Sequence, residues 1–338
     1  MQQRQKRTAL VLSGGGARGS YQVGTLKAIA HIQPDGGMNP FDIICGTSAG
    51  ALNASMLACE SDHYGHAVKR LETLWQNLQS DQIHKVGYTQ LLKSTLRLFF
   101  SFFHDGIASG AASALLDNEP LRKLLSTEIN FDKLDEHINN GRLRALCITA
   151  LAYNSGHNIS FFQGSPNIKG WRRNQRLGVG TRLTHDHLMA SSALPTIFPP
   201  VKIDHEYFGD GAIRQRAPLS AALHLGAEKL FVVGVSYHEK EQEEPQNPII
   251  HTPTFAQIAG HLLNSSFIDA MDEDIEMLEK FNFISRYLSS DQLKAANIRP
   301  IDVLTITPSI KFDEIAAKHI STLPLSMRTF FKTIGATS

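Results

Sequence analysis

The clearest candidate for chemistry in this chain is a serine in a tight glycine turn. Ser48 is the central residue of the sequence Gly-Thr-Ser-Ala-Gly at positions 46–50, which fits the pattern G-x-S-x-G. An apolar strand pattern precedes this turn and a helix pattern of small residues follows it. Gly46 and Gly50 lack the Cβ atoms that would crowd the turn, so the backbone can lift the Ser48 hydroxyl into the open. The pattern predicts a nucleophile elbow, placed near a helix N-terminus that favours developing negative charge.

A second glycine-rich turn lies upstream. Residues 8–12 have a buried strand pattern, and Gly14, Gly16 and Gly19 follow with the spacing G-x-G-x-x-G before a helix pattern. A loop of this kind can seat the pyrophosphate of a dinucleotide. It can also direct backbone N–H groups at the oxyanion of a tetrahedral intermediate. The spacing alone therefore leaves two interpretations open.

Two observations favour the oxyanion hole. A nicotinamide site expects an acidic residue at the end of the next strand, about 20 residues beyond the loop. Here that strand runs into residues 46–50, and Asp35 and Asp42 lie before or inside it. In addition, the two strands each end in a glycine turn, and parallel strands would bring both turns to one edge of the sheet. Of the two interpretations of the glycine loop, an oxyanion hole is strongly favoured over phosphate binding.

The base that would activate Ser48 is not marked by a histidine pattern. The chain has 15 histidines, and those that follow the elbow and qualify on chain order alone are His224, His238, His251, His261 and His319. A different candidate is Asp210, which follows a short strand around residues 206–208 and lies between Gly209 and Gly211. The flanking glycines predict a sharp, exposed turn. An Asp-Gly pair is most often only a turn, so its weight depends on the other motifs.

Taken together, these motifs resemble the patatin-like phospholipases. The glycine loop at residues 14–19, the elbow at residues 46–50 and the Asp-Gly-Ala sequence at residues 210–212 have the order and approximate spacing of that family. Residues 190–200 are similar to the segment before the family's aspartate, and the resemblance covers roughly residues 7–236. It implies an α/β fold with three α/β/α layers and a mainly parallel central sheet.

The resemblance also implies a role for each motif. Ser48 is then the nucleophile, and Asp210 is its partner in a Ser–Asp dyad without histidine, followed by Gly211 and Ala212. The oxyanion hole is formed by Gly14, Gly15, Gly16, Ala17, Arg18 and Gly19. For Arg18 two interpretations stand equal: a solvated or paired surface charge, or a cation that balances the phosphate of a lipid headgroup.

The expected activity is hydrolysis of fatty-acyl esters of phospholipids or lysophospholipids through an acyl-enzyme, with no cofactor or metal. An aspartate with a free pKa of about 3.9 is a weak base, and burial in an apolar cleft would raise that pKa. One alternative is acyl transfer to an acceptor other than water, because the acyl-enzyme is shared. Another is a nucleotide-binding regulatory module that uses residues 14–19.

The composition of the chain indicates which binding partners and which cellular compartment it fits. The net charge of +1 implies no global attraction to nucleic acid. The three cysteines, Cys45, Cys59 and Cys147, have no paired spacing, which suits a reducing compartment without structural zinc. The apolar run after the basic N-terminus ends at Leu12, too short for a signal peptide, and no run is long enough to cross a bilayer. We expect a cytoplasmic protein with a lipid substrate and transient contact with membrane surfaces; its oligomeric state is left open.

The remaining patterns describe the scaffold. Residues 144–151 and 158–162 predict strands of a hairpin, and residues 229–235 predict a further buried strand. Expected helices span residues 63–80, 88–103, 118–127, 218–225 and 255–278. The apolar block at residues 91–103 fits a buried helix or, alternatively, a lid that touches lipid. Residues 239–248 predict a mobile loop, and residues 237–338 a helical extension packed on the catalytic domain of residues 7–236.

Overall fold

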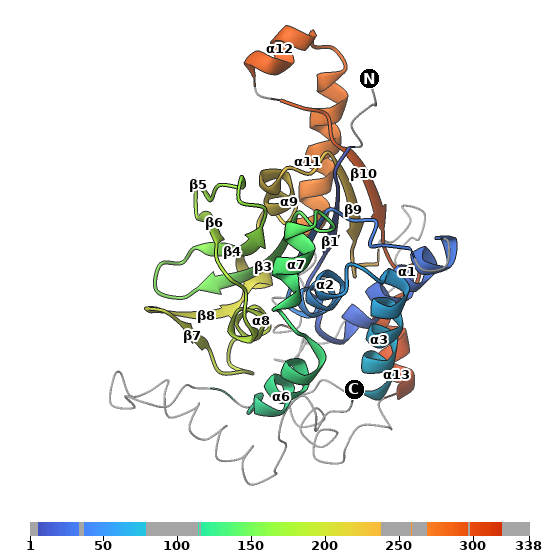
Figure 1. Ribbon diagram of the computed structural model, residues 1–338, viewed down its shortest axis with the longest axis vertical. Coiled ribbons are helices and arrows are strands. Elements are labelled where there is room, and N and C mark those ends of the chain that lie inside the picture. Colours follow the sequence, from blue (N-terminus) through green and yellow to red (C-terminus); the bar gives the residue numbers. More distant parts are fainter. Residues whose placement is uncertain are drawn as a thin grey trace.

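A mixed β-sheet forms the centre of the computed structural model (Figure 1). The structure describes residues 6–33, 37–78, 114, 116–237, 258, 269–296 and 298–319. Five neighbouring strands of the sheet are parallel, in the spatial order β10 (Asp302–Ile306), β9 (Lys229–Val233), β1 (Thr8–Leu12), β2 (Ile43–Thr47) and β3 (Ala145–Ala152).

Beyond β3 the sheet becomes mostly antiparallel. The strand β4 (Asn158–Gly164) is antiparallel to β3 and is followed by β6 (Arg176–Gly180) and β5 (Trp171–Arg173). The end of β3 also pairs with β8 (Glu206–Asp210), and β8 pairs with β7 (Val201–Ile203). The predicted hairpin of β3 and β4 is therefore confirmed, and β8 adds a second antiparallel partner at the end of β3.

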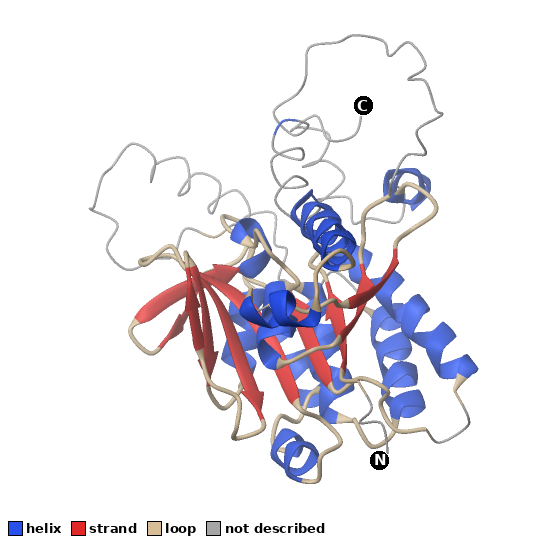
Figure 2. Ribbon diagram, turned by 90° about the horizontal axis from the view of Figure 1, so that it is seen from above, coloured by secondary structure: helices blue, strands red, loops and turns tan. Residues whose placement is uncertain are grey.

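Helices cover both faces of the sheet because its strands are apolar on both sides (Figure 2). In β1, Leu10 and Leu12 join one core, while Ala9 and Val11 join the other. The first core is closed by α1 (Gly19–Ile32), α2 (Ala49–Cys59), α3 (Tyr64–Asn77), α6 (Glu119–Glu128), α7 (Lys133–Asn139) and α8 (His185–Ser191). The second is closed by α9 (Ser220–Leu225) and α11 (Asp269–Ser285). The predicted three-layer α/β/α arrangement with a mainly parallel central sheet is confirmed.

The C-terminal part differs from the expected helical extension because it contributes a strand. Besides α11, it contains α12 (Ser290–Ala295), β10 and α13 (Phe312–His319). The strand β10 is parallel to β9 in full register, and Met271 of α11 is buried in the second core. These contacts tie the described C-terminal residues to the sheet. The division into residues 7–236 and 237–338 stays a prediction.

Several other expectations can be compared with the structure. The helices α3, α6 and α9 correspond to the patterns at 63–80, 118–127 and 218–225, and α9 ends at Gly226 with a left-handed φ of 101°. The pattern at residues 88–103, with its apolar block, and the loop at residues 239–248 lie outside the described residues. No helix within the described ranges is long and apolar enough to cross a membrane.

Candidate active site

The serine of the G-x-S-x-G pattern occupies a strained turn between β2 and α2. Ser48 has φ 55° and ψ −126°, and residues other than glycine rarely adopt a positive φ. Holding the backbone in this conformation costs on the order of 1–3 kcal/mol. A Cβ at Gly46 would overlap the Gly50 carbonyl oxygen, and a Cβ at Gly50 would overlap the carbonyl oxygens that end β1. Both positions therefore require glycine, and a tight strand-to-helix turn with Ser48 at its apex is present.

Asp210 lies beside Ser48 because neighbouring strands place the two together. Thr47 at the end of β2 pairs with Thr149 of β3, and the next residue of β3, Ala150, pairs with Asp210 of β8. The Ser48 side chain lies close enough to the Asp210 carboxylate to lower its pKa. Asp210 Oδ1 also accepts the backbone N–H of Ala212 at 2.9 Å.

The expectation of an exposed turn at Asp210 is wrong. Asp210 is the last residue of β8 and only 1% exposed, and Ser48 is only 7% exposed. A Cβ at Gly211 would overlap the Thr149 carbonyl oxygen, so this glycine allows a close approach to β3 rather than a free loop. The glycines around Asp210 thus permit burial.

Burial changes the acid–base behaviour of Asp210. Desolvation raises the pKa of its carboxyl to about 7, while the interactions with the Ser48 side chain and the Ala212 N–H act in the opposite direction. A carboxylate with a pKa near the working pH is a far better proton acceptor than a solvated aspartate. The nearby Tyr153 responds as well: partial burial and then the Asp210 charge raise the pKa of its hydroxyl.

The glycine loop at residues 14–19 lies against the elbow. Leu12, at the end of β1, pairs with Gly46, so the two turns leave the sheet at the same edge, as the sequence predicts. A Cβ at Gly19 would come within 2.9 Å of the Cβ of Ala49, the residue after Ser48. The N–H groups of Gly14, Gly15 and Gly16 donate to no acceptor within the described residues. Free backbone donors therefore lie beside Ser48.

The Arg18 side chain takes an arrangement that neither interpretation anticipated. Its guanidinium lies over the ring of Phe312 in α13, with Cζ 5.8 Å from the ring centroid. The Tyr21 ring contacts the same phenylalanine edge-on at 6.0 Å. Arg18 thus joins the glycine loop to the C-terminal part through a cation–π contact.

Two buried polar groups hold the site in place and were not identified from the sequence. Ser191, at the end of α8, accepts the backbone N–H of Ser48 at 2.9 Å and donates to the Thr149 carbonyl at 2.6 Å. This serine falls within the segment 190–200 that resembles the family, but the segment alone gives no hydrogen-bond partner. The sequence therefore marked the segment that contains Ser191 but did not indicate what this serine does.

The second group connects the glycine loop to α2. The Asn53 amide donates to the Gly19 carbonyl at 3.0 Å and to Gln22 Oε1 at 2.9 Å. Gln22 in turn donates to the Ser13 carbonyl at 2.8 Å, and Trp75 Nε1 donates to Asn53 Oδ1 at 2.8 Å. Gln22 and Asn53 are fully buried. An asparagine among the small and apolar residues of α2 is the sequence signal that could have revealed this network.

His224, the candidate whose side chain the structure describes, does not reach the site. His224 lies in α9, with Nδ1 2.8 Å from the Ser220 carbonyl oxygen and its ring stacked on Trp171. His319 ends α13, and His238, His251 and His261 lie outside the described residues. None of the histidine side chains that the structure describes is hydrogen-bonded to Ser48 or Asp210. Likewise, the described part of the chain contains no cluster of residues that could hold a metal ion.

The fold and the two glycine turns agree with comparison to known proteins. The family model "Patatin-like phospholipase" matches residues 10–223, which is more than half of the chain. The chain therefore belongs to the patatin-like phospholipase family.

Individual relatives are more distant. A cGAMP-activated phospholipase of Pseudomonas aeruginosa is 28% identical over 215 residues, covering 64% of this chain and 55% of that protein. A cGAMP-activated phospholipase of Vibrio cholerae is 29% identical over 225 residues, covering 64% and 56%. The chain thus spans just over half the length of these curated relatives. The crystal structure of VipD from Legionella pneumophila covers 91% of this chain and 63% of its own, with a TM-score of 0.41 and 13% identity.

Proposed function

We propose that this protein hydrolyses fatty-acyl ester bonds of phospholipids or lysophospholipids, with Ser48 as the nucleophile and Asp210 as its base. The observation that carries this proposal is the position of Ser48 beside a buried carboxylate, Asp210, whose pKa is raised to about 7. Family membership supports the substrate class. The Ser–Asp pair and the backbone donors around it can supply the roles that ester hydrolysis needs.

The first step is acylation. Asp210 accepts the hydroxyl proton while Ser48 Oγ forms a bond to the ester carbonyl carbon. The carbonyl oxygen becomes an oxyanion, which the free N–H groups of residues 14–16 and the start of α2 can stabilise. When the intermediate collapses, the bond to the leaving alcohol breaks, and that alcohol takes the proton from Asp210. The fatty-acyl group is then esterified to Ser48.

The second step is deacylation. Asp210, ionised again, accepts a proton from a water molecule as its oxygen attacks the acyl carbon. Collapse of this second intermediate releases the fatty acid and returns the proton to Ser48. An alcohol in place of water would give acyl transfer by the same route. Analysis of products with and without an added acceptor distinguishes hydrolysis from transfer.

The experiment that tests the proposal combines labelling and product analysis. A fluorophosphonate should label Ser48, and Ser48→Ala should lower ester hydrolysis by about 10³-fold or more. The matched control is Ser55→Ala in α2, the helix that follows Ser48, because the Ser55 hydroxyl is buried without a hydrogen-bond partner among the described residues. Full activity of Ser48→Ala, or labelling at another serine, would overturn the assignment.

Mass spectrometry of products from a mixed lipid extract then identifies the headgroup and the ester position. Two relatives are named for activation by cGAMP, and calorimetric titration of this chain with that nucleotide tests the alternative of a nucleotide-binding module. Nucleotide binding without labelling of Ser48 would favour that alternative over a hydrolase.

A further inference from the structure

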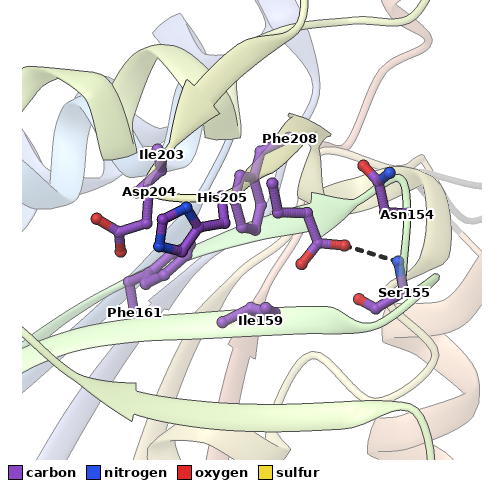
Figure 3. A pocket seen from close by; sticks show the side chains of 9 residues that line it. Asn154, Ser155, Ile159, Phe161, Ile203, Asp204, His205 and Phe208 are labelled. Carbon is purple, nitrogen blue, oxygen red and sulfur yellow. Dashed lines mark hydrogen bonds between the residues drawn. The ribbon is translucent and has the colours of Figure 1, made fainter.

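A cavity of about 600 Å³ lies on the same edge of the sheet as the Ser48–Asp210 pair but takes no part in the proposed reaction. It opens between two turns: the turn at residues 153–156 that follows β3, and the turn at residues 204 and 205 between β7 and β8 (Figure 3). Its lining includes neither Ser48 nor Asp210.

Strand geometry places the cavity relative to the Ser48–Asp210 pair. Glu206, Phe208 and Asp210 occupy every second position of β8, so their side chains lie on the same face of the strand. Four residues of β-strand span about 13 Å. The cavity thus lies outward from Asp210 along one strand, and Phe208 separates the two sites.

The floor of the cavity is apolar and aromatic. Ile159, Phe161 and Phe208 line it, and all three are buried. The rings of Phe161 and Phe208 pack edge-on with centroids 5.3 Å apart, which fixes the shape of the floor. Such a floor favours methyl, methylene or aromatic groups of a ligand.

The rim carries negative charge. Asp204 and Glu206 line it together with His205, and neither Lys nor Arg is among the lining residues that the structure describes. Glu206 Oε1 accepts the Ser155 N–H at 2.6 Å, which connects the two turns and leaves its second oxygen for other partners. The Asp204 carboxylate is exposed and forms no hydrogen bond or salt bridge with a described residue, although its charge acts on the buried His187 ring.

We propose that this cavity binds an organic ammonium ion, with its apolar groups on the floor and its charge facing Asp204 and Glu206. An anion would be repelled by the two carboxylates, whereas a ligand that is both apolar and cationic can contact the floor and the charged rim together. A bare divalent cation is disfavoured, because no group of three metal-ligating side chains occurs in the described residues. Free amines and the choline or ethanolamine group of a zwitterionic lipid carry this chemistry. The proposal does not rest on the proposed enzymatic activity.

The charge requirement is tested with a pair of probes of equal shape. Choline and its neutral isostere 3,3-dimethyl-1-butanol are titrated into the full-length protein by calorimetry. Choline should bind at least about tenfold more tightly, because only its trimethylammonium group has a charge for the carboxylates to balance. Equal binding of the two, or no binding of choline at millimolar concentration, overturns the proposal.

Variants then locate the bound choline. Asp204→Asn combined with Glu206→Gln removes both charges, while the glutamine carbonyl can still accept the Ser155 N–H, and choline affinity should fall about tenfold. The matched control is Asp132→Asn, a carboxylate 78% exposed that pairs with Arg182 and does not line the cavity. Unchanged affinity in the double variant, with a wild-type melting temperature, overturns the site.

The source of the ammonium group is resolved with vesicles. Ser48→Ala protein, chosen so that the lipid stays intact, is sedimented with phosphatidylcholine or phosphatidylglycerol vesicles. Retention on phosphatidylcholine that free choline competes away, and that the double variant loses, identifies a lipid headgroup as the ligand. Calorimetric choline binding without such retention identifies a free organic cation. Either outcome supports the site.

Discussion

The backbone N–H of Ser48 donates a hydrogen bond to Ser191 Oγ at 2.9 Å, and the same hydroxyl donates to the Thr149 carbonyl at 2.6 Å. Ser191 thereby joins the elbow to the adjacent strand. Because Ser48 holds a positive φ, its backbone would relax if nothing opposed the change. Ser191 is fully buried, so water cannot take the place of its hydroxyl as the partner of the Ser48 N–H.

Ser191→Ala should therefore reduce turnover without abolishing it. The change leaves the Ser48 N–H buried and unpaired, which costs about 1–3 kcal/mol. We expect kcat to fall about 10- to 100-fold on a soluble ester, with little change in KM. Ser192→Ala is the matched control, because Ser192 is the next residue and the hydrogen bonds to Ser48 and Thr149 come from the Ser191 hydroxyl. A wild-type kcat in Ser191→Ala would show that the elbow holds its conformation unaided.

The raised pKa of Asp210 predicts the pH dependence of the reaction. The base must be ionised to accept the Ser48 proton, and burial raises the pKa of Asp210 to about 7. We expect kcat/KM for a soluble short-chain ester to rise tenfold per pH unit below about pH 7 and to level off above it. A rate that stays flat down to pH 5 would contradict the assignment of Asp210 as the base.

The same shift predicts a gain of stability in Asp210→Asn. The folded-state pKa of about 7 exceeds the unfolded value of about 3.9, so the folded protein holds an extra proton between these values. The stability that this proton provides is fully present below about pH 4 and is lost as the pH rises through 7.

Asparagine does not titrate and can still accept the Ala212 N–H. Relative to the wild type, the variant should become more stable by about 1.4 kcal/mol per pH unit across this window, and by no more than about 4 kcal/mol in total. Urea unfolding at pH 5 and pH 8 measures the change, with Asp132→Asn as the surface control. A stability difference that does not depend on pH would exclude a raised pKa. Activity should be nearly abolished in the same variant.

Substitution of the candidate histidines, unlike that of Asp210, should leave most of the activity intact. His224→Ala, and single alanine substitutions of His238, His251, His261 and His319, should each retain substantial activity if Asp210 is the base. The assay is hydrolysis of the short-chain ester, with a melting temperature for each variant to separate lost folding from lost chemistry. If one of them abolishes turnover in a folded protein while Asp210→Asn does not, the enzyme uses a Ser–His–Asp triad instead.

The sequence predicts the parts of the site that depend on local pattern. The elbow, the glycine loop and their shared sheet edge follow from two adjacent strand–turn–helix patterns, and the structure places Gly19 against Ala49 accordingly. Contacts between distant residues carry no such pattern. Ser191 is 143 residues from Ser48, and Arg18 contacts Phe312 of the C-terminal part. The burial of Asp210 was missed for the same reason, because the glycines that suggest an exposed turn also allow close packing on β3.

Asn53→Leu tests whether the network behind the glycine loop acts on catalysis as well as stability. Leucine is close to asparagine in size but cannot hydrogen-bond, so the Gly19 carbonyl, the Gln22 amide and Trp75 Nε1 lose a buried partner. We expect kcat to fall at least about tenfold, because residues 14–19 are no longer fixed beside Ser48, while KM changes little.

Trp75→Phe is the graded control for this network. It removes only the outermost hydrogen bond and leaves the bonds from Asn53 to Gly19 and Gln22 intact. Its kcat should fall less than about threefold, although both variants lower the melting temperature through an unsatisfied buried group. Steady-state kinetics on a soluble ester and thermal unfolding are measured in parallel. If the two variants lose kcat only in proportion to their loss of stability, Asn53 is a structural residue alone; a larger loss of kcat in Asn53→Leu at matched stability identifies it as a positioning residue for the glycine loop.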